Sequence, residues 1–273
     1  MSSSTDAGAA PFADPTFTPS QITTFPVPFS TLPNLSCYAS HYAVVFDNVL
    51  TPAECTHLLT SLPPTPWDAA ARCPNPTFRN SQRVMLDSQT ATTDLLLSRL
   101  SPYLPSKLDP TSNALILGKD ATRPFSKARG ESGYWELVGL NERLRYLRYE
   151  QGQFFRPHCD GAYAVEGGKE KAFLTLQLYL SGDEDAQGGE TRFLSEDRKG
   201  WWDCEPKRGR VVVFQQRGLW HEGREVRNGV KVTMRTDLMY RPVVIGREET
   251  KRRREEEAKR VRQQDEEEEG RIE

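Results

Sequence analysis

Residues 173–180 read Phe-Leu-Thr-Leu-Gln-Leu-Tyr-Leu and alternate strictly between two kinds of side chain. Because successive residues of a β-strand point to opposite faces of its sheet, this stretch predicts a strand with two different faces. The leucines at 174, 176, 178 and 180 form one face, which suits packing against helices or a second sheet. The other face mixes aromatic, hydroxyl and amide groups and suits the wall of a polar cavity: Phe173, Thr175, Gln177 and Tyr179.

Other stretches with a period of two predict further strands between glycine-containing turns. These strands are expected at residues 43–46, 144–149, 153–158, 192–194, 210–214 and 231–240. A helix is predicted after the first of them, because Thr51 is a good N-cap, Pro52 follows at the first helical position and Glu54 closes a capping box. A second helix is expected over residues 92–104. Two helices followed by many short strands indicate an α+β fold, a jelly roll with N-terminal helices packed on one outer face.

The two ends of the chain differ from this central part in composition. Residues 1–36 are rich in Ser, Thr and Pro and are predicted to be disordered or loosely draped over the domain. Residues 244–273 are strongly charged and are predicted to form a helical or disordered tail. The folded domain is therefore expected to span residues 37–243.

Charge and cysteine patterns bear on location and partners. The net charge of −2 implies no global attraction to nucleic acid or to anionic membranes. No Lys or Arg precedes Arg72, which argues against a secretory or mitochondrial leader, and no apolar run approaches the roughly 18 residues of a membrane span. The five cysteines are scattered without CxxC spacing. We therefore expect a cytoplasmic or nuclear protein without a signal peptide or transmembrane segment.

Two of the four histidines lie at strand ends beside glycine-containing turns. His158 and Asp160 are separated by one residue, so on an extended chain both point to the same side while Cys159 points away. With the distant His221 they form a two-histidine, one-carboxylate set, which is the ligand set of non-haem iron(II) oxygenases. The residues alone leave alternatives open, because an isolated HxD pair is common by chance and zinc also binds His and Asp.

Several motifs in a fixed order surround this ligand set. They are Asp47-Asn-Val-Leu-Thr-Pro-Ala-Glu-Cys55, Tyr149-Glu-Gln-Gly-Gln-Phe-Phe-Arg-Pro-His158-Cys-Asp160, Leu178-Tyr-Leu-Ser181, Gly188-Gly-Glu-Thr-Arg-Phe193, Gly209-Arg-Val-Val-Val-Phe214 and His221-Glu-Gly-Arg-Glu-Val-Arg-Asn-Gly-Val-Lys231. From about Ala43 to Tyr240 the chain resembles the prolyl 4-hydroxylase-like 2-oxoglutarate oxygenases. The resemblance implies a double-stranded β-helix, with residues 37–243 as the catalytic domain.

The resemblance also implies the cofactors and the residues that bind them. Fe(II) would be bound by His158, Asp160 and His221, and 2-oxoglutarate and O2 would be co-substrates, with L-ascorbate left open as a further cofactor. Asp160 stands where halogenating relatives have a small residue, so hydroxylation is favoured. Lys231 matches the lysine that binds the far carboxylate of 2-oxoglutarate. We assign Tyr179 as a hydrogen-bond donor to it, Arg235 to the metal end and Tyr149 to the pocket wall.

The substrate of such an enzyme is a C–H bond in a protein side chain or a small molecule, and the sequence does not choose between them. The ending Arg235-Thr-Asp-Leu-Met-Tyr240 differs from that of the collagen-modifying enzymes, which makes collagen a doubtful substrate. An alternative function is a catalytically silent binding module that keeps the fold. Nucleic acid is not expected as a partner, since the catalytic region has no run of basic residues interleaved with aromatic ones.

Overall fold

The computed structural model describes residues 10–63, 67–69, 75–121, 124–125, 129, 131–182, 184–249, 251–252, 255 and 259. Its helices are α1 (Pro52–Thr60), α2 (Thr90–Leu100) and α3 (Ala114–Leu117), and single 3-10 turns are η1 (Pro19–Gln21), η2 (Ser36–Tyr38), η3 (Gly118–Asp120) and η5 (Glu166–Gly168). Within this described part of the chain, no helix is long and apolar enough to cross a membrane.

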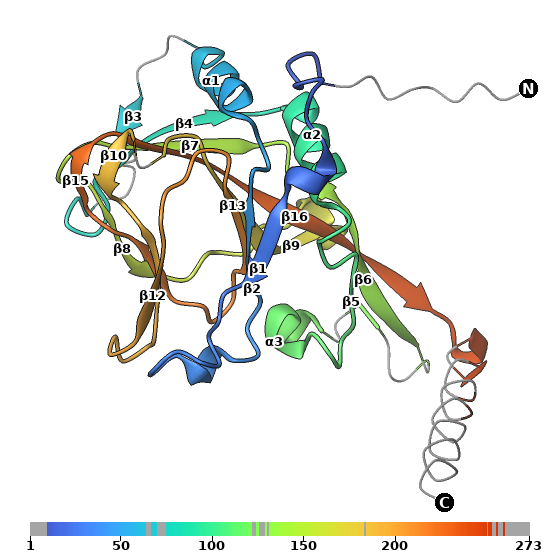
Figure 1. The fold of residues 1–273 in the computed structure, drawn as a ribbon. Coiled ribbons are helices and arrows are strands. Elements are labelled where there is room, and N and C mark those ends of the chain that lie inside the picture. The colour runs from blue at the N-terminus through green and yellow to red at the C-terminus, as the bar shows by residue number, and fades with distance from the viewer. Residues whose placement is uncertain are drawn as a thin grey trace, which may run out of the picture.

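The strands form a large antiparallel sheet that curls toward a smaller one (Figure 1). The large sheet contains β1 (Thr23–Pro26), β2 (Ala43–Asp47), β13 (Val211–Gln215), β9 (Lys171–Tyr179), β16 (Lys231–Ile245), β7 (Leu144–Tyr149), β4 (Gln82–Leu86) and β3 (Asp68–Ala69) in that order, with β6 (Ser132–Leu140) on β16 and β5 (Lys107–Leu108) on β6. The small sheet has the order β12 (Trp201–Cys204), β11 (Thr191–Leu194), β14 (His221–Gly223) and β8 (Phe155–His158). A separate ribbon pairs β10 (Ala186–Gly188) with β15 (Val226–Gly229).

The two faces of β9 are used as the alternation predicts. Its leucines join a buried cluster with Leu58 of α1 and Leu96 of α2, so this face meets the helices. On the opposite face, Tyr179 shares a second cluster with Phe193 of β11, which shows that the small sheet covers it. This arrangement is the predicted jelly roll. Phe173 is an exception: it joins the helix-side cluster, next to a register shift between β9 and β16.

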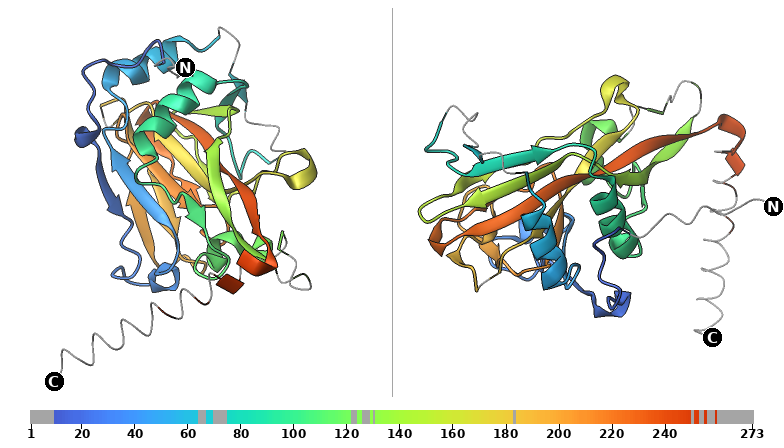
Figure 2. Two further views of the ribbon diagram at one scale, coloured as in Figure 1. Left: turned by 90° about the vertical axis from the view of Figure 1, so that its right-hand side faces the viewer. Right: turned by 90° about the horizontal axis from the view of Figure 1, so that it is seen from above.

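Strand β16 runs along the large sheet and pairs with β9, β7 and β6 (Figure 2). It continues to Ile245, five residues beyond the predicted end and into the segment expected to be a charged tail. From residue 250 onward, all of that tail except residues 251, 252, 255 and 259 lies outside the described residues.

In the N-terminal segment, residues 10–36 lie against the domain. Strand β1 pairs with β2, and Phe29 is only 2% exposed. Farther back, Phe17 covers the guanidinium of Arg99 at 3.5 Å from its ring centroid. The spaced phenylalanines thus supply individual docking contacts that the average composition of the segment does not indicate.

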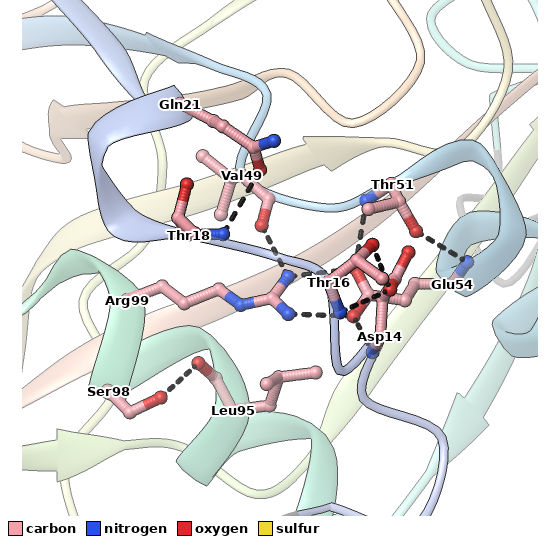
Figure 3. A network of polar contacts seen from close by, with 10 residues as sticks. All are labelled: Asp14, Thr16, Thr18, Gln21, Val49, Thr51, Glu54, Leu95, Ser98 and Arg99. Atoms are coloured by element: carbon pink, nitrogen blue, oxygen red, sulfur yellow. Dashed lines mark hydrogen bonds and ion pairs between the residues drawn. The ribbon is translucent and has the colours of Figure 1, made fainter.

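A buried ion pair joins this segment to both helices (Figure 3). Arg99 of α2 donates from Nη1 and Nη2 to the two carboxylate oxygens of Glu54 at 2.8 and 2.7 Å. The same oxygens accept the backbone N–H groups of Thr51, which closes the predicted capping box, and of Asp14 in the N-terminal segment. One carboxylate thus ties three parts of the chain together.

We predict that Arg99→Met destabilises the fold by about 3–5 kcal/mol, because it leaves the Glu54 carboxylate buried without its cation. The free energy of unfolding is measured by urea denaturation. The control is Arg143→Met, whose ion pair with Asp87 is exposed on both sides and should contribute less than about 1 kcal/mol. Equal losses in the two variants would show that the buried pair has no special role.

Candidate metal centre

The antiparallel pairing of β8 and β14 brings the two histidines together. His221 stands opposite His158 in the register, and the centroids of the imidazole rings are 4.3 Å apart. Asp160 follows β8 by two residues, and its Oδ1 lies 3.7 Å from each Nε2. The three side chains each offer one ligand atom within 4.8 Å of the others. Among the described residues, no other group of three His, Cys, Asp or Glu side chains meets this condition.

Both imidazoles are held in the tautomer that a metal ion needs. Nδ1 of His158 lies 2.8 Å from the carbonyl oxygen of Arg156, and Nδ1 of His221 lies 3.1 Å from that of Leu219. A carbonyl only accepts, so each Nδ1 carries the hydrogen and each Nε2 keeps its lone pair. Burial lowers the pKa of His158 to about 3 and also lowers the pKa of His221. Both rings are therefore neutral near pH 7.

Asp160 is an anion with its two oxygens in different surroundings. Oδ2 accepts a hydrogen bond from the Thr175 hydroxyl at 2.6 Å, whereas Oδ1 faces the histidines and lies 2.7 Å from Nη1 of Arg235. Burial alone would raise the pKa of Asp160, but Arg235 and the other groups around the carboxylate together lower it to about 2.

One cavity is lined by the three side chains of the ligand group and by Lys231, which is only 2% exposed. Its Nζ is 5.0 Å from the ring centroid of Tyr149 and 5.7 Å from that of Tyr179. Within the described part of the chain, no carboxylate lies within 4.0 Å of this ammonium, and burial lowers its pKa to about 8. The stem of Lys231 passes over Gly189, where an added Cβ would lie 2.9 Å from Cδ. The cavity thus contains a buried cation without a matching anion.

Gln177 and Thr191 also line this cavity. Gln177 lies on the strand face that was predicted to line a polar cavity, whereas Thr191 was not predicted as a site residue. Thr191 Oγ1 accepts hydrogen bonds from the Tyr179 hydroxyl at 2.6 Å and from Nε2 of Gln177 at 2.7 Å. Its own hydroxyl hydrogen is consequently free for a ligand. Tyr179, assigned as a hydrogen-bond donor to 2-oxoglutarate, donates its hydroxyl hydrogen to Thr191, which lines the cavity. The sequence offered a signal for Thr191, because it directly precedes the predicted strand 192–194. Strand alternation puts its side chain on the face opposite to that of Arg192.

Asp160 also borders a second cavity, of about 210 Å³, on the side of α3. Its wall includes Phe173 of β9, Ile116 of α3 and Gln216 at the end of β13. Cys159 lines this second cavity and is not part of the ligand group, as the strand alternation predicts. The candidate metal centre therefore lies between two cavities, one with Lys231 and one without.

Residues 144–236 match the family model of the 2OG-Fe(II) oxygenase superfamily. No protein in the curated set matches significantly. Among solved structures, the chain is 19% identical to a viral collagen prolyl hydroxylase from Paramecium Bursaria Chlorella virus-1, in complex with 2-oxoglutarate, over 73% of this chain and 96% of that one, with a TM-score of 0.42.

A Pseudomonas putida prolyl-4-hydroxylase is also 19% identical, over 74% of this chain and 95% of that one, with a TM-score of 0.45. The match to the family model includes all three side chains of the ligand group as well as Lys231 and Arg235. The resemblance that the sequence predicts is thereby confirmed at the level of the superfamily. Residues 144–236 thus carry the similarity to the 2OG-Fe(II) oxygenase superfamily, and the activity that this match supports is that of a 2-oxoglutarate-dependent dioxygenase.

Proposed function

We propose that this protein hydroxylates a C–H bond of a protein side chain or a small molecule, with release of succinate and CO2. The observation that carries the proposal is one cavity that holds both the His158, Asp160 and His221 group and the buried ammonium of Lys231. A dioxygenase of this kind needs a metal with open positions and a place for an anionic co-substrate. Both requirements meet here.

Three protein ligands would hold the Fe(II) ion: Nε2 of His158, Nε2 of His221 and Oδ1 of Asp160. The donor set fits because both nitrogens have free lone pairs and the carboxylate is ionised. When bound, the ion would activate O2, with 2-oxoglutarate supplying two electrons as it is oxidised to succinate and CO2. The hydrogen bond from Thr175 to Oδ2 orients the carboxylate so that Oδ1 faces the imidazoles.

Lys231 and Thr191 would bind the far carboxylate of 2-oxoglutarate. An unpaired ammonium in a buried cavity is costly, and a dicarboxylate ligand supplies the missing anion. Thr191, which lines the same cavity, adds a hydroxyl donor, since two other groups already donate to its oxygen. Tyr149 forms part of the wall next to the ammonium. Arg235, which contacts Asp160, belongs to the metal end of the cavity.

The substrate would reach the centre through the second cavity, because Asp160 borders it and Lys231 does not. Its wall combines apolar side chains with the amide of Gln216. L-Ascorbate, as a reductant that restores the enzyme after uncoupled turnover, is part of the proposal.

We expect purified protein with Fe(II), ascorbate and 2-oxoglutarate to release succinate, and the rate to rise with a matching peptide or metabolite. Asp160→Ala should abolish this release, because two neutral imidazoles leave the charge of a divalent ion uncompensated. The matched control is Asp203→Asn, which removes a strand carboxylate outside the ligand group and should retain the wild-type rate. Unchanged release in Asp160→Ala would refute the ligand assignment. Failure of the wild type to release succinate with every substrate would favour the silent binding module.

We predict that Lys231→Met raises the KM for 2-oxoglutarate at least ~100-fold while metal affinity changes little. Loss of a buried charge pair costs about 3–5 kcal/mol, and roughly 1.4 kcal/mol corresponds to a tenfold change in affinity. Arg235→Met should instead lower kcat more than it raises this KM, since Arg235 lies at the metal end.

The comparison of the two KM changes decides between the assignments. A much larger increase in Arg235→Met than in Lys231→Met would reverse the two roles. If neither variant raises the KM, 2-oxoglutarate does not bind to β16.

A further inference from the structure

Two arginines face each other on the inner surface of the large sheet. Arg235 of β16 stands opposite Arg145 of β7 in the register, an arrangement that is unfavourable for like charges. Asp237 lies on the same face as Arg235, is 1% exposed and reduces the repulsion between the two arginines. Its Oδ2 accepts from Nη1 of Arg145 at 2.9 Å, and its Oδ1 lies 3.6 Å from Nη2 of Arg235.

Arg235 thus lies between two buried carboxylates. One is Asp237, and the other is Asp160, whose Oδ1 is 2.7 Å from Nη1. The guanidinium of Arg235 also donates to Thr175 at 3.4 Å, while its buried Nε has no partner among the described residues. Two arginines and two aspartates balance in this group, so its charge is neutral without a metal ion.

A divalent ion on Asp160 would disturb this balance. The oxygen that faces both imidazoles is the same Oδ1 that Arg235 contacts, so the guanidinium and the ion compete for one atom. Once Oδ1 is shared with a dication, it becomes a poorer partner for Arg235 because the two cations repel each other. Among the described residues, Asp237 is the other carboxylate within 4.0 Å of this guanidinium, with its Oδ1 3.6 Å from Nη2.

We propose that Asp237 is a positioning residue that takes over Arg235 from Asp160 when Asp160 binds the metal ion. Asp237 then keeps the guanidinium at the metal end of the cavity without letting it block the ligand oxygen. Gln216 holds Asp237 in place by donating from Nε2 to Oδ1 at 3.0 Å. Since Gln216 also lines the second cavity, this hydrogen bond links the proposed substrate side to the metal end. The inference rests on the proposed metal centre.

The test is a double-mutant cycle on metal affinity, measured by calorimetric titration of the full-length chain with Mn(II) in the absence of 2-oxoglutarate. Arg235→Met should raise Mn(II) affinity by about tenfold, because a competing cation is removed. Asp237→Asn should lower it by about tenfold in the wild-type background, where Arg235 stays on Asp160, but by no more than about threefold in the Arg235→Met background. The coupling separates action through Arg235 from a general structural effect.

Two controls accompany the cycle. Asp47→Asn removes another buried strand carboxylate, which holds Arg210 and Lys207, and should leave Mn(II) affinity within about twofold. His158→Ala should abolish binding. Circular dichroism and urea midpoints verify that each variant folds. If Asp237→Asn does not fold, the increase in Mn(II) affinity expected for Arg235→Met still tests whether Arg235 and the ion compete for Asp160.

Equal losses for Asp237→Asn in both backgrounds, or unchanged affinity in Arg235→Met, would overturn the inference while the metal centre stands. If the wild type itself does not bind Mn(II), or if His158→Ala binds it equally well, the metal centre fails and this inference fails with it.

Discussion

The register between β8 and β14 is the constraint on which the candidate site depends. It sets His221 opposite His158, and Asp160 follows within two residues. A shift of one residue would turn one imidazole to the other face of the small sheet and separate the ligand atoms. The large sheet contributes the remaining groups from its inner face, because Thr175, Lys231 and Arg235 alternate toward the same space on β9 and β16. Two sheets facing each other are therefore needed for one site.

Charge then distinguishes the two ends of the cavity. At the metal end, Arg235 is shared between Asp160 and Asp237, so the cation is compensated before any ligand binds. At the other end, Lys231 is buried beside two tyrosine rings and has no carboxylate within 4.0 Å in the described part of the chain. An anionic ligand gains most at the uncompensated cation. This asymmetry explains how a dicarboxylate would enter in one orientation.

The parts of the fold with strong local signals were predictable from the sequence. The capping box of α1, the alternation of β9 and the bounds of β7 all agree with the structure. Strands β4, β6 and β12 were missed because their partners, rather than their own pattern, make them strands. The N-terminal contacts of Phe17 and Phe29 were missed for the same reason. At the site, the ligand triad was visible as a motif, but Thr191 and Asp237 act through neighbours that only the folded chain brings near.

We infer that one cavity binds Fe(II) and 2-oxoglutarate together. Anaerobic titration of the protein with Fe(II) and 2-oxoglutarate, followed by visible absorption, tests it most directly, because the chelate has a weak charge-transfer band that neither component shows alone. We expect the band to appear with one Fe(II) per chain, to need both components and to be lost in His221→Ala. Absence of the band at saturating concentrations of both, or an unchanged band in His221→Ala, would contradict the account.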